Sequence, residues 1–183
     1  MLVHVSKAFT REEPAEAAVV VPPRAPLPAG TPNYVTPRGL ELLRAESHDL
    51  ARERAEAERA VDGADRPRAL ERLNRRKADL DQRLTGAVVV SAPDAPCREV
   101  RFGAVVTVRG ESGVERRFQI VGVDEAHPSD GRVAFVSPLA RALLGRGVGD
   151  TATLRTTRGD EELEVLAVDY PAAGDPPGGA SER

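Results

Sequence analysis

The sequence predicts an α+β protein, in which an N-terminal antiparallel two-helix coiled-coil hairpin precedes a small antiparallel-sheet domain with one short helix. Three observations predict this fold class. Residues 36–87 carry apolar side chains at alternating steps of three and four, which is the heptad spacing of a narrow helical seam. After Pro96 the pattern changes to short valine-rich runs separated by glycine-containing turns, which is typical of strands. Ser137–Pro138 then opens a short helix between two of these runs.

Length and composition limit the function classes. A chain of 183 residues with 3% aromatic residues and no tryptophan predicts one or two small domains with an aliphatic core. The net charge of −3 argues against a generally basic nucleic-acid-binding surface. Cys97 has no second cysteine to pair with, so a reducing compartment fits best. Because the chain shows no signal-peptide pattern and no long apolar run, we expect a soluble cytoplasmic protein without membrane contact.

The two ends of the chain are rich in proline and glycine. Residues 1–33 contain several prolines and are predicted to form a disordered extension, because such segments stay extended without a packed core. Within the extension, Ala17–Val21 is a short apolar run that is able to add a strand to another element. Residues 171–183 are predicted to form a second disordered tail.

The hairpin is predicted over residues 34–90. Thr36–Pro37 is an N-cap followed by a first-turn proline, Asp62–Gly63 ends the first helix, and Asp65 with Pro67 begins the second. Arg54 and Lys77 are predicted to oppose each other in the middle of the seam, with Glu53 and Asp81 offsetting their charge. The predicted seam consists of Leu40, Leu43, Ser47, Leu50, Arg54, Ala57 and Val61, and of Leu70, Leu73, Lys77, Leu80, Leu84 and Ala87.

Residues 91–97 are predicted to be a linker and residues 98–170 the second domain. Hairpin loops are expected at Gly110–Gly113 and at 158–160. The short helix is expected at Leu139–Leu144, where Gly145 stops it. The predicted strands are Val100–Val108, Val114–Val123, Val133–Val136, Thr151–Thr156 and Glu162–Val168.

Several stretches resemble one family in order and spacing. Arg101–Val108, Phe118–Glu125, Val136–Gly145 and Gly147–Asp150, together with the hairpin entry Tyr34–Gly39, resemble the Gre transcription elongation factors GreA and GreB. The resemblance implies an FKBP-like C-terminal domain that docks at the rim of the secondary channel of bacterial RNA polymerase. It also implies that the hairpin enters this channel and comes near the nascent RNA, in a monomeric protein that is not itself an enzyme.

The hairpin tip is the candidate metal site. In the cleavage-competent members of the family that the chain resembles, tip carboxylates help to hold a second Mg²⁺ beside the polymerase's own metal. That tip reads Gly-Asp-x-x-Glu-Asn, and Asp62 and Asp65 have its spacing of three. Here, however, the second acid is shorter, Arg66 follows it, and the arm is about 10 Å shorter than the resemblance implies. The same two acids also suit a helix end and a helix start.

We therefore expect a regulator that occupies the channel without efficient cleavage and holds no cofactor when alone. Mg²⁺ would bind at Asp62 and Asp65 only within the polymerase complex. The alternative is a genuine transcript-cleavage factor that uses both acids.

The resemblance also implies a docking surface around the short helix. Val136, Ser137 and Pro138 correspond to the expected contact with the polymerase, and Arg141 lies on the same helix. Asp124 ends its strand and is expected either near this surface or in a solvated turn. Ser137 and Pro138 also suit an N-cap and a first-turn proline.

Two other readings belong to different classes. A shared C-terminal fold allows a peptidyl-prolyl isomerase or chaperone-like module, although fold alone does not carry function. Residues 100–170 contain few aromatic side chains for an isomerase pocket, namely Phe102, Phe118, Phe135 and Tyr170. The other reading is self-association through exposed leucines of the hairpin.

Overall fold

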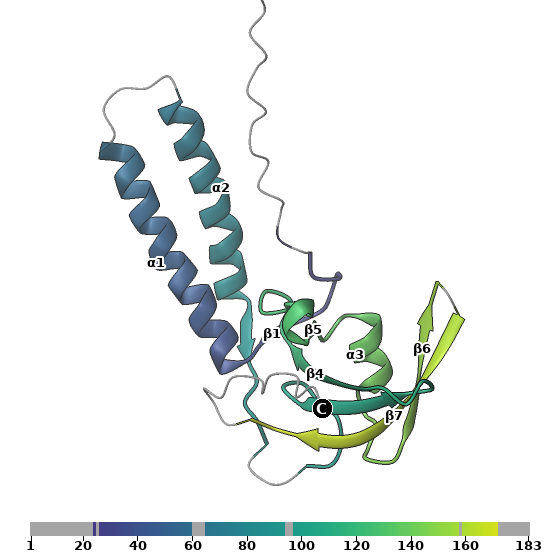
Figure 1. The fold of residues 1–183 in the computed structure, drawn as a ribbon. Coiled ribbons are helices and arrows are strands. Elements are labelled where there is room, and N and C mark those ends of the chain that lie inside the picture. Colours follow the sequence, from purple (N-terminus) through teal and green to yellow (C-terminus); the bar gives the residue numbers. More distant parts are fainter. Residues whose placement is uncertain (1–23, 25, 60–64, 94–96, 158, 172–183) are drawn as a thin grey trace, which may run out of the picture.

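A computed structural model describes residues 24, 26–59, 65–93, 97–157 and 159–171. The predicted fold class is confirmed, since two long helices form an arm that stands on a curled sheet with one short helix (Figure 1). Among the described residues, no helix is long and apolar enough to cross a membrane.

The arm consists of α1 (Pro37–Arg59) and α2 (Arg66–Thr85). Thr36 caps α1 as predicted, because its Oγ1 accepts a hydrogen bond from the backbone N–H of Gly39 at 2.9 Å. Asp65 occupies the N-cap position of α2, but its side chain makes no capping hydrogen bond. The 23 residues of α1 give the arm a length of about 34 Å.

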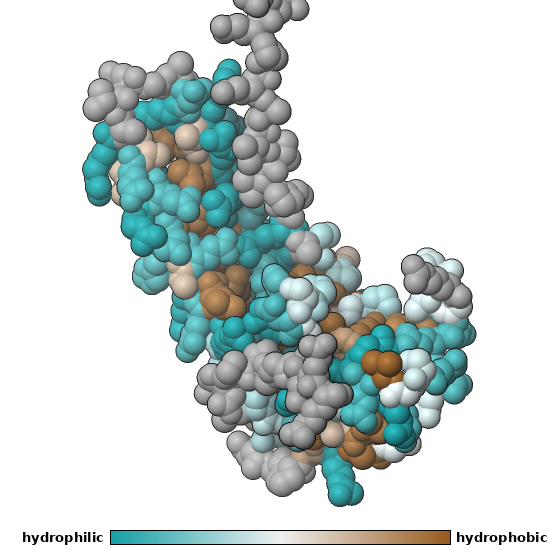
Figure 2. All heavy atoms as spheres, in the orientation of Figure 1, coloured by the Kyte–Doolittle hydropathy of each residue, from teal (hydrophilic) through white to brown (hydrophobic). Residues whose placement is uncertain are grey.

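The apolar seam is confirmed where the helices lie close to the sheet domain. Leu43, Leu50 and Leu80 are buried between the helices, and Leu40, Leu73, Leu84 and Ala87 pack partly against them. The arm is hydrophilic over most of the surface seen in Figure 2, with apolar side chains between the helices.

In the charged layer of the seam, Asp81 offsets Lys77 as predicted, whereas Glu53 does not offset Arg54. Arg54 and Lys77 are exposed, and each pairs within its own helix, Arg54 with Glu58 at 3.0 Å and Lys77 with Asp81 at 2.6 Å. Glu53 does not offset Arg54, because it pairs across the helices with Arg76 at 3.4 Å. The two like charges therefore reach solvent instead of facing each other, as long basic side chains can.

A small parallel sheet at the base of the arm was not predicted. Strand β1 (Asn33–Val35) pairs in parallel with β2 (Ala87–Val89). Asn33, which the prediction placed in the disordered extension, is 6% exposed and donates a side-chain hydrogen bond to the carbonyl of Arg83 at 2.9 Å. Strands of three residues are too short to show an alternating pattern, so periodicity does not reveal them.

The main sheet has the strand order β5-β4-β3-β7-β6. Its strands are β3 (Val105–Gly110), β4 (Glu115–Val121), β5 (Arg132–Ala134), β6 (Thr151–Thr156) and β7 (Gly159–Asp169). The sheet is mixed, not wholly antiparallel as expected, because β5 pairs in parallel with β4. The chain returns for this pairing through a short 3-10 helix, η1 (Pro128–Asp130).

The other boundaries shift by a few residues. The strand expected from Val100 begins only at Val105, because residues 101–104 form a turn in which Gly103 has a φ of +88°. Helix α3 (Pro138–Leu143) starts one residue before the expected Leu139. Its Ala140 and Leu143 are buried in the aliphatic core with Val106, Ile120 and other sheet residues, so α3 covers one face of the sheet.

Candidate functional site

The described part of the hairpin tip is Asp65, whereas Asp62 lies outside the described residues. The Asp65 side chain is 92% exposed, and its Oδ1 lies 3.8 Å from Nη1 of Arg68. The described residues include no cluster of three or more His, Cys, Asp or Glu side chains able to hold a metal ion. Since Mg²⁺ is commonly held by one or two carboxylates together with substrate groups and waters, Asp65 can act as a ligand only with groups supplied from elsewhere.

Three of the predicted docking residues gather at the start of α3. Ser137 has extended backbone angles, and its Oγ accepts a hydrogen bond from the backbone N–H of Ala140 at 3.2 Å, which makes it the N-cap. Pro138 is in the first turn and exposed, and Arg141 is exposed one turn later. Positions three apart share a helix face, so Pro138 and Arg141 present one surface while the opposite face is buried.

The approach to α3 is tied to the base of the arm. Val136 is half-buried, and the preceding Phe135 packs its ring against two others. The ring centroids of Phe135 and Tyr34 lie 5.5 Å apart, and those of Phe135 and Phe102 lie 5.7 Å apart. Tyr34 and Phe102 complete the cluster at 5.8 Å. Because Tyr34 belongs to β1, this cluster fixes the docking residues relative to the arm.

The structure places Asp124 at the base of the arm, which corrects the expectation of a solvated turn. Its side chain is 8% exposed, so it does not lie in a solvated turn. Its Oδ1 accepts a hydrogen bond from Nη1 of Arg24 at 2.8 Å, and its Oδ2 lies 3.7 Å from Nε of Arg83. The carboxylate therefore joins the sheet domain to α2 and to the segment before β1, and both of its oxygens face arginines.

Arg24 completes a charged junction that sequence analysis missed. Its guanidinium also contacts Glu46 of α1. Burial by itself would lower the pKa of Arg24, but hydrogen bonds to Glu46 and Asp124 outweigh it and hold the pKa above its ordinary value. An isolated arginine in a proline-rich segment carries no sequence signal for a partner 100 positions away.

A second contact at the junction requires the arm and the sheet domain to lie very close together. Glu125 is buried, and its Oε2 accepts a hydrogen bond from the hydroxyl of Thr36 at 2.5 Å. A Cβ on Gly39 would come within 2.8 Å of this carboxylate oxygen, and a Cβ on Gly122 within 2.6 Å of the Tyr34 carbonyl oxygen. Real Cβ atoms essentially never show such distances, so both glycines allow the arm to sit against the sheet domain.

The geometry thus defines a class of protein. A narrow two-helix arm is held at a fixed angle on a small sheet domain, and a serine-capped helix is exposed beside the junction. Such an arm extends its tip away from the sheet domain.

Comparisons with known proteins agree with this class. The family model for the C-terminal domain of the transcription elongation factors GreA and GreB matches residues 95–170. Transcription elongation factor GreB of Neisseria meningitidis serogroup B is 37% identical over 158 residues, which are 76% of this chain and 95% of that protein. GreB of Pseudomonas aeruginosa is 35% identical over 164 residues, which are 82% of this chain and 97% of that protein. The chain therefore belongs to the GreA/GreB family of transcription elongation factors.

Solved structures of related proteins also match. The crystal structure of GreA factor homolog 1 (Gfh1) of Thermus thermophilus is 25% identical, with a TM-score of 0.36 over 74% of this chain and 97% of that chain.

Proposed function

We propose that this protein is an RNA polymerase-binding regulator of transcription elongation. Its C-terminal domain docks at the rim of the polymerase secondary channel, and the arm enters the channel. The proposal rests on the rigidly held arm of this chain, whose relatives are named transcription elongation factors. The protein acts through the polymerase and is not itself an enzyme.

The junction supports this role mechanically. An arm of about 34 Å places its tip reproducibly only if its base does not swing. Here the base is held by the aromatic cluster, by the Thr36–Glu125 hydrogen bond and by the ion pairs of Asp124. Each contact joins the arm or the segment before it to the sheet domain.

The exposed start of α3 is the proposed docking surface. Pro138 and Arg141 share a face, and Ser137 organises the helix start through its capping bond. Arg141 is the natural partner for a carboxylate on the polymerase, because its guanidinium forms bidentate pairs.

The tip supports occupancy of the channel without efficient cleavage. Arg68 lies beside Asp65 and competes for its carboxylate. Ion pairs this exposed contribute little stability, so the Arg68–Asp65 pair does not exclude a metal. Arg68 nevertheless places a positive charge where a cation would have to bind. The genuine cleavage factor remains the second candidate, since Asp62 and Asp65 keep the spacing of three.

An isomerase function has less support. Phe102 and Phe135 pack with Tyr34 at the junction, so these rings are used in holding the arm and are not free to line a proline-binding pocket.

The test is binding and cleavage with the cognate polymerase. Pro138→Glu combined with Arg141→Glu should weaken binding by about tenfold or more, because it reverses charge on the docking face. The matched control is Arg155→Glu, an exposed charge on the edge strand β6. Equal binding by all variants would refute the docking surface.

Cleavage is measured separately in a stalled, backtracked elongation complex. Wild type is expected to leave the transcript intact while still binding the polymerase. Rapid Mg²⁺-dependent cleavage that Asp62→Ala with Asp65→Ala abolishes would establish the cleavage factor instead.

A further inference from the structure

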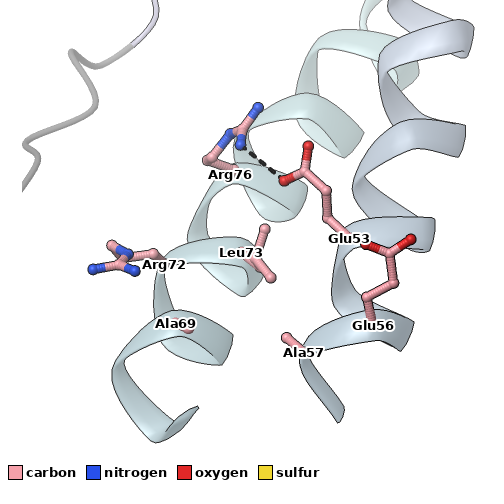
Figure 3. Close-up of a pocket in the computed structure, with 7 residues that line it drawn as sticks. All are labelled: Glu53, Glu56, Ala57, Ala69, Arg72, Leu73 and Arg76. Atoms are coloured by element: carbon pink, nitrogen blue, oxygen red, sulfur yellow. Dashed lines mark hydrogen bonds and ion pairs between the residues drawn. The ribbon is translucent and has the colours of Figure 1, made fainter. Parts of the chain in front are cut away.

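A groove opens between the two helices in the half of the arm nearest the tip. It has a volume of about 510 Å³. Ala57 of α1 and Ala69 and Leu73 of α2 line its apolar floor, and Glu53, Arg72 and Arg76 stand along its rim (Figure 3). The small alanines leave this part of the seam unfilled, whereas leucines fill it nearer the base.

Ion pairs connect this groove to the N-terminal segment. Arg24 contacts Glu46, whose Oε1 lies 3.9 Å from Nη2 of Arg76. The other Nη of Arg76 lies 3.4 Å from Glu53 on the groove rim. Because each charge contacts the next, Arg24 is anchored on the same side of the arm as the groove.

The distance from Arg24 to the groove suits the apolar run that precedes it. Residues 53–57 lie seven to eleven positions beyond Glu46, which is about 10 to 17 Å along the helix. Ala17–Val21 lies three to seven positions before Arg24, which is about 10 to 23 Å in an extended chain. Pro22 and Pro23 favour an extended backbone between Val21 and Arg24.

We propose that the segment Ala17–Val21 of this chain docks in the groove of the arm. Its valines cover Ala57, Ala69 and Leu73, which removes apolar surface from water on both sides. Arg72 forms no ion pair with another described residue. Once the segment is docked, Glu16 is close enough to pair with Arg72. The N-terminal segment thereby thickens the arm near its tip. The proposal does not depend on binding to polymerase.

The test is disulfide formation in the full chain with Cys97→Ser. Val19→Cys is combined with Ala57→Cys on the groove floor, or with Ala55→Cys as the control. Both alanines are half-buried, and a step of two residues turns a helix by more than half a turn, so Ala55 lies on the opposite side. The effective concentration of each pair is measured in a glutathione redox buffer, because a disulfide requires Cα atoms within about 7 Å.

The Ala57 pair should show an effective concentration about tenfold or more above the control. A docked segment holds the two cysteines at a higher effective concentration than a flexible tether does. Ala17→Cys and Val21→Cys replace Val19→Cys in parallel, so that a shift in register does not hide the contact. Equal values for the Ala57 and Ala55 pairs at all three positions would overturn the proposal. Disulfide-linked dimers that increase with protein concentration would also overturn it, because the occupant would then be a second copy.

Discussion

Thr36 is the residue at which helix capping and the domain junction meet. Its Oγ1 accepts a hydrogen bond from Gly39 N at 2.9 Å and donates one to Glu125 Oε2 at 2.5 Å. Thr36→Ala removes both. The lost N-cap costs about 1 kcal/mol, and the buried carboxylate loses a hydrogen bond to a charged group, worth about 1.5 to 3 kcal/mol. We therefore expect the free energy of unfolding to fall by about 3 kcal/mol.

The assay is urea unfolding followed by circular dichroism, with Thr36→Ala, Glu125→Gln and the double variant compared in a cycle. The two single effects should not add, and the coupling energy should be about 1 to 2 kcal/mol, because the residues share one hydrogen bond. Thr153→Ala, an exposed position on β6, is the matched control and should change stability by less than about 0.5 kcal/mol. Additive effects, or a loss for Thr36→Ala equal to that of the control, would refute the reasoning.

Three further predictions concern the arm, the junction and the residue that follows the last strand. Leu80→Ala should lower the free energy of unfolding by about 2 to 5 kcal/mol, since Leu80 is fully buried between the helices, whereas Leu42→Ala at an exposed position of α1 should cost less than about 1 kcal/mol. Gly122→Ala should cost about 1 to 3 kcal/mol in the same assay, because its Cβ would meet the Tyr34 carbonyl oxygen at 2.6 Å. Burial raises the pKa of Tyr170 to about 12 in the folded protein, whereas an ordinary tyrosine has a pKa of about 10. The contribution of Tyr170 to stability is therefore complete below pH about 10 and is lost as the pH rises from about 10 to about 12. Phenolate absorbance of the Tyr34→Phe variant measures this titration, and a midpoint at the ordinary pKa of tyrosine would contradict it.

The features that sequence predicted are those set by neighbours within one or two helical turns. The heptad spacing located Leu43, Leu50 and Leu80 in the seam, and Ser137 was recognisable as a cap because its partner, Ala140, is three positions away. The strand order and the parallel pairing of β5 depend on contacts between distant segments, which periodicity does not report.

The junction was missed for the same reason. Asp124 reads locally as a polar turn, and only the fold brings Arg24 and Arg83 to its two oxygens. Gly39 and Gly122 likewise read as ordinary glycines, although each leaves space for a specific atom of the other domain. Conversely, the exposure of Asp65 follows directly from its place at a helix start next to the turn.

The junction and the proposed docking surface share the same short stretch of chain. Phe135 packs against Tyr34 at the base of the arm, and Ser137 caps α3 two residues later. A contact that shifts α3 would therefore also displace the rings of the aromatic cluster. Through Tyr34, the displacement would reach β1 and the start of α1. Because the packed rings resist small displacements, the proposed docking at α3 would be coupled to the direction of the arm through this stretch. In the proposed binding mode, the seating of the sheet domain on the polymerase would therefore set the position of the tip.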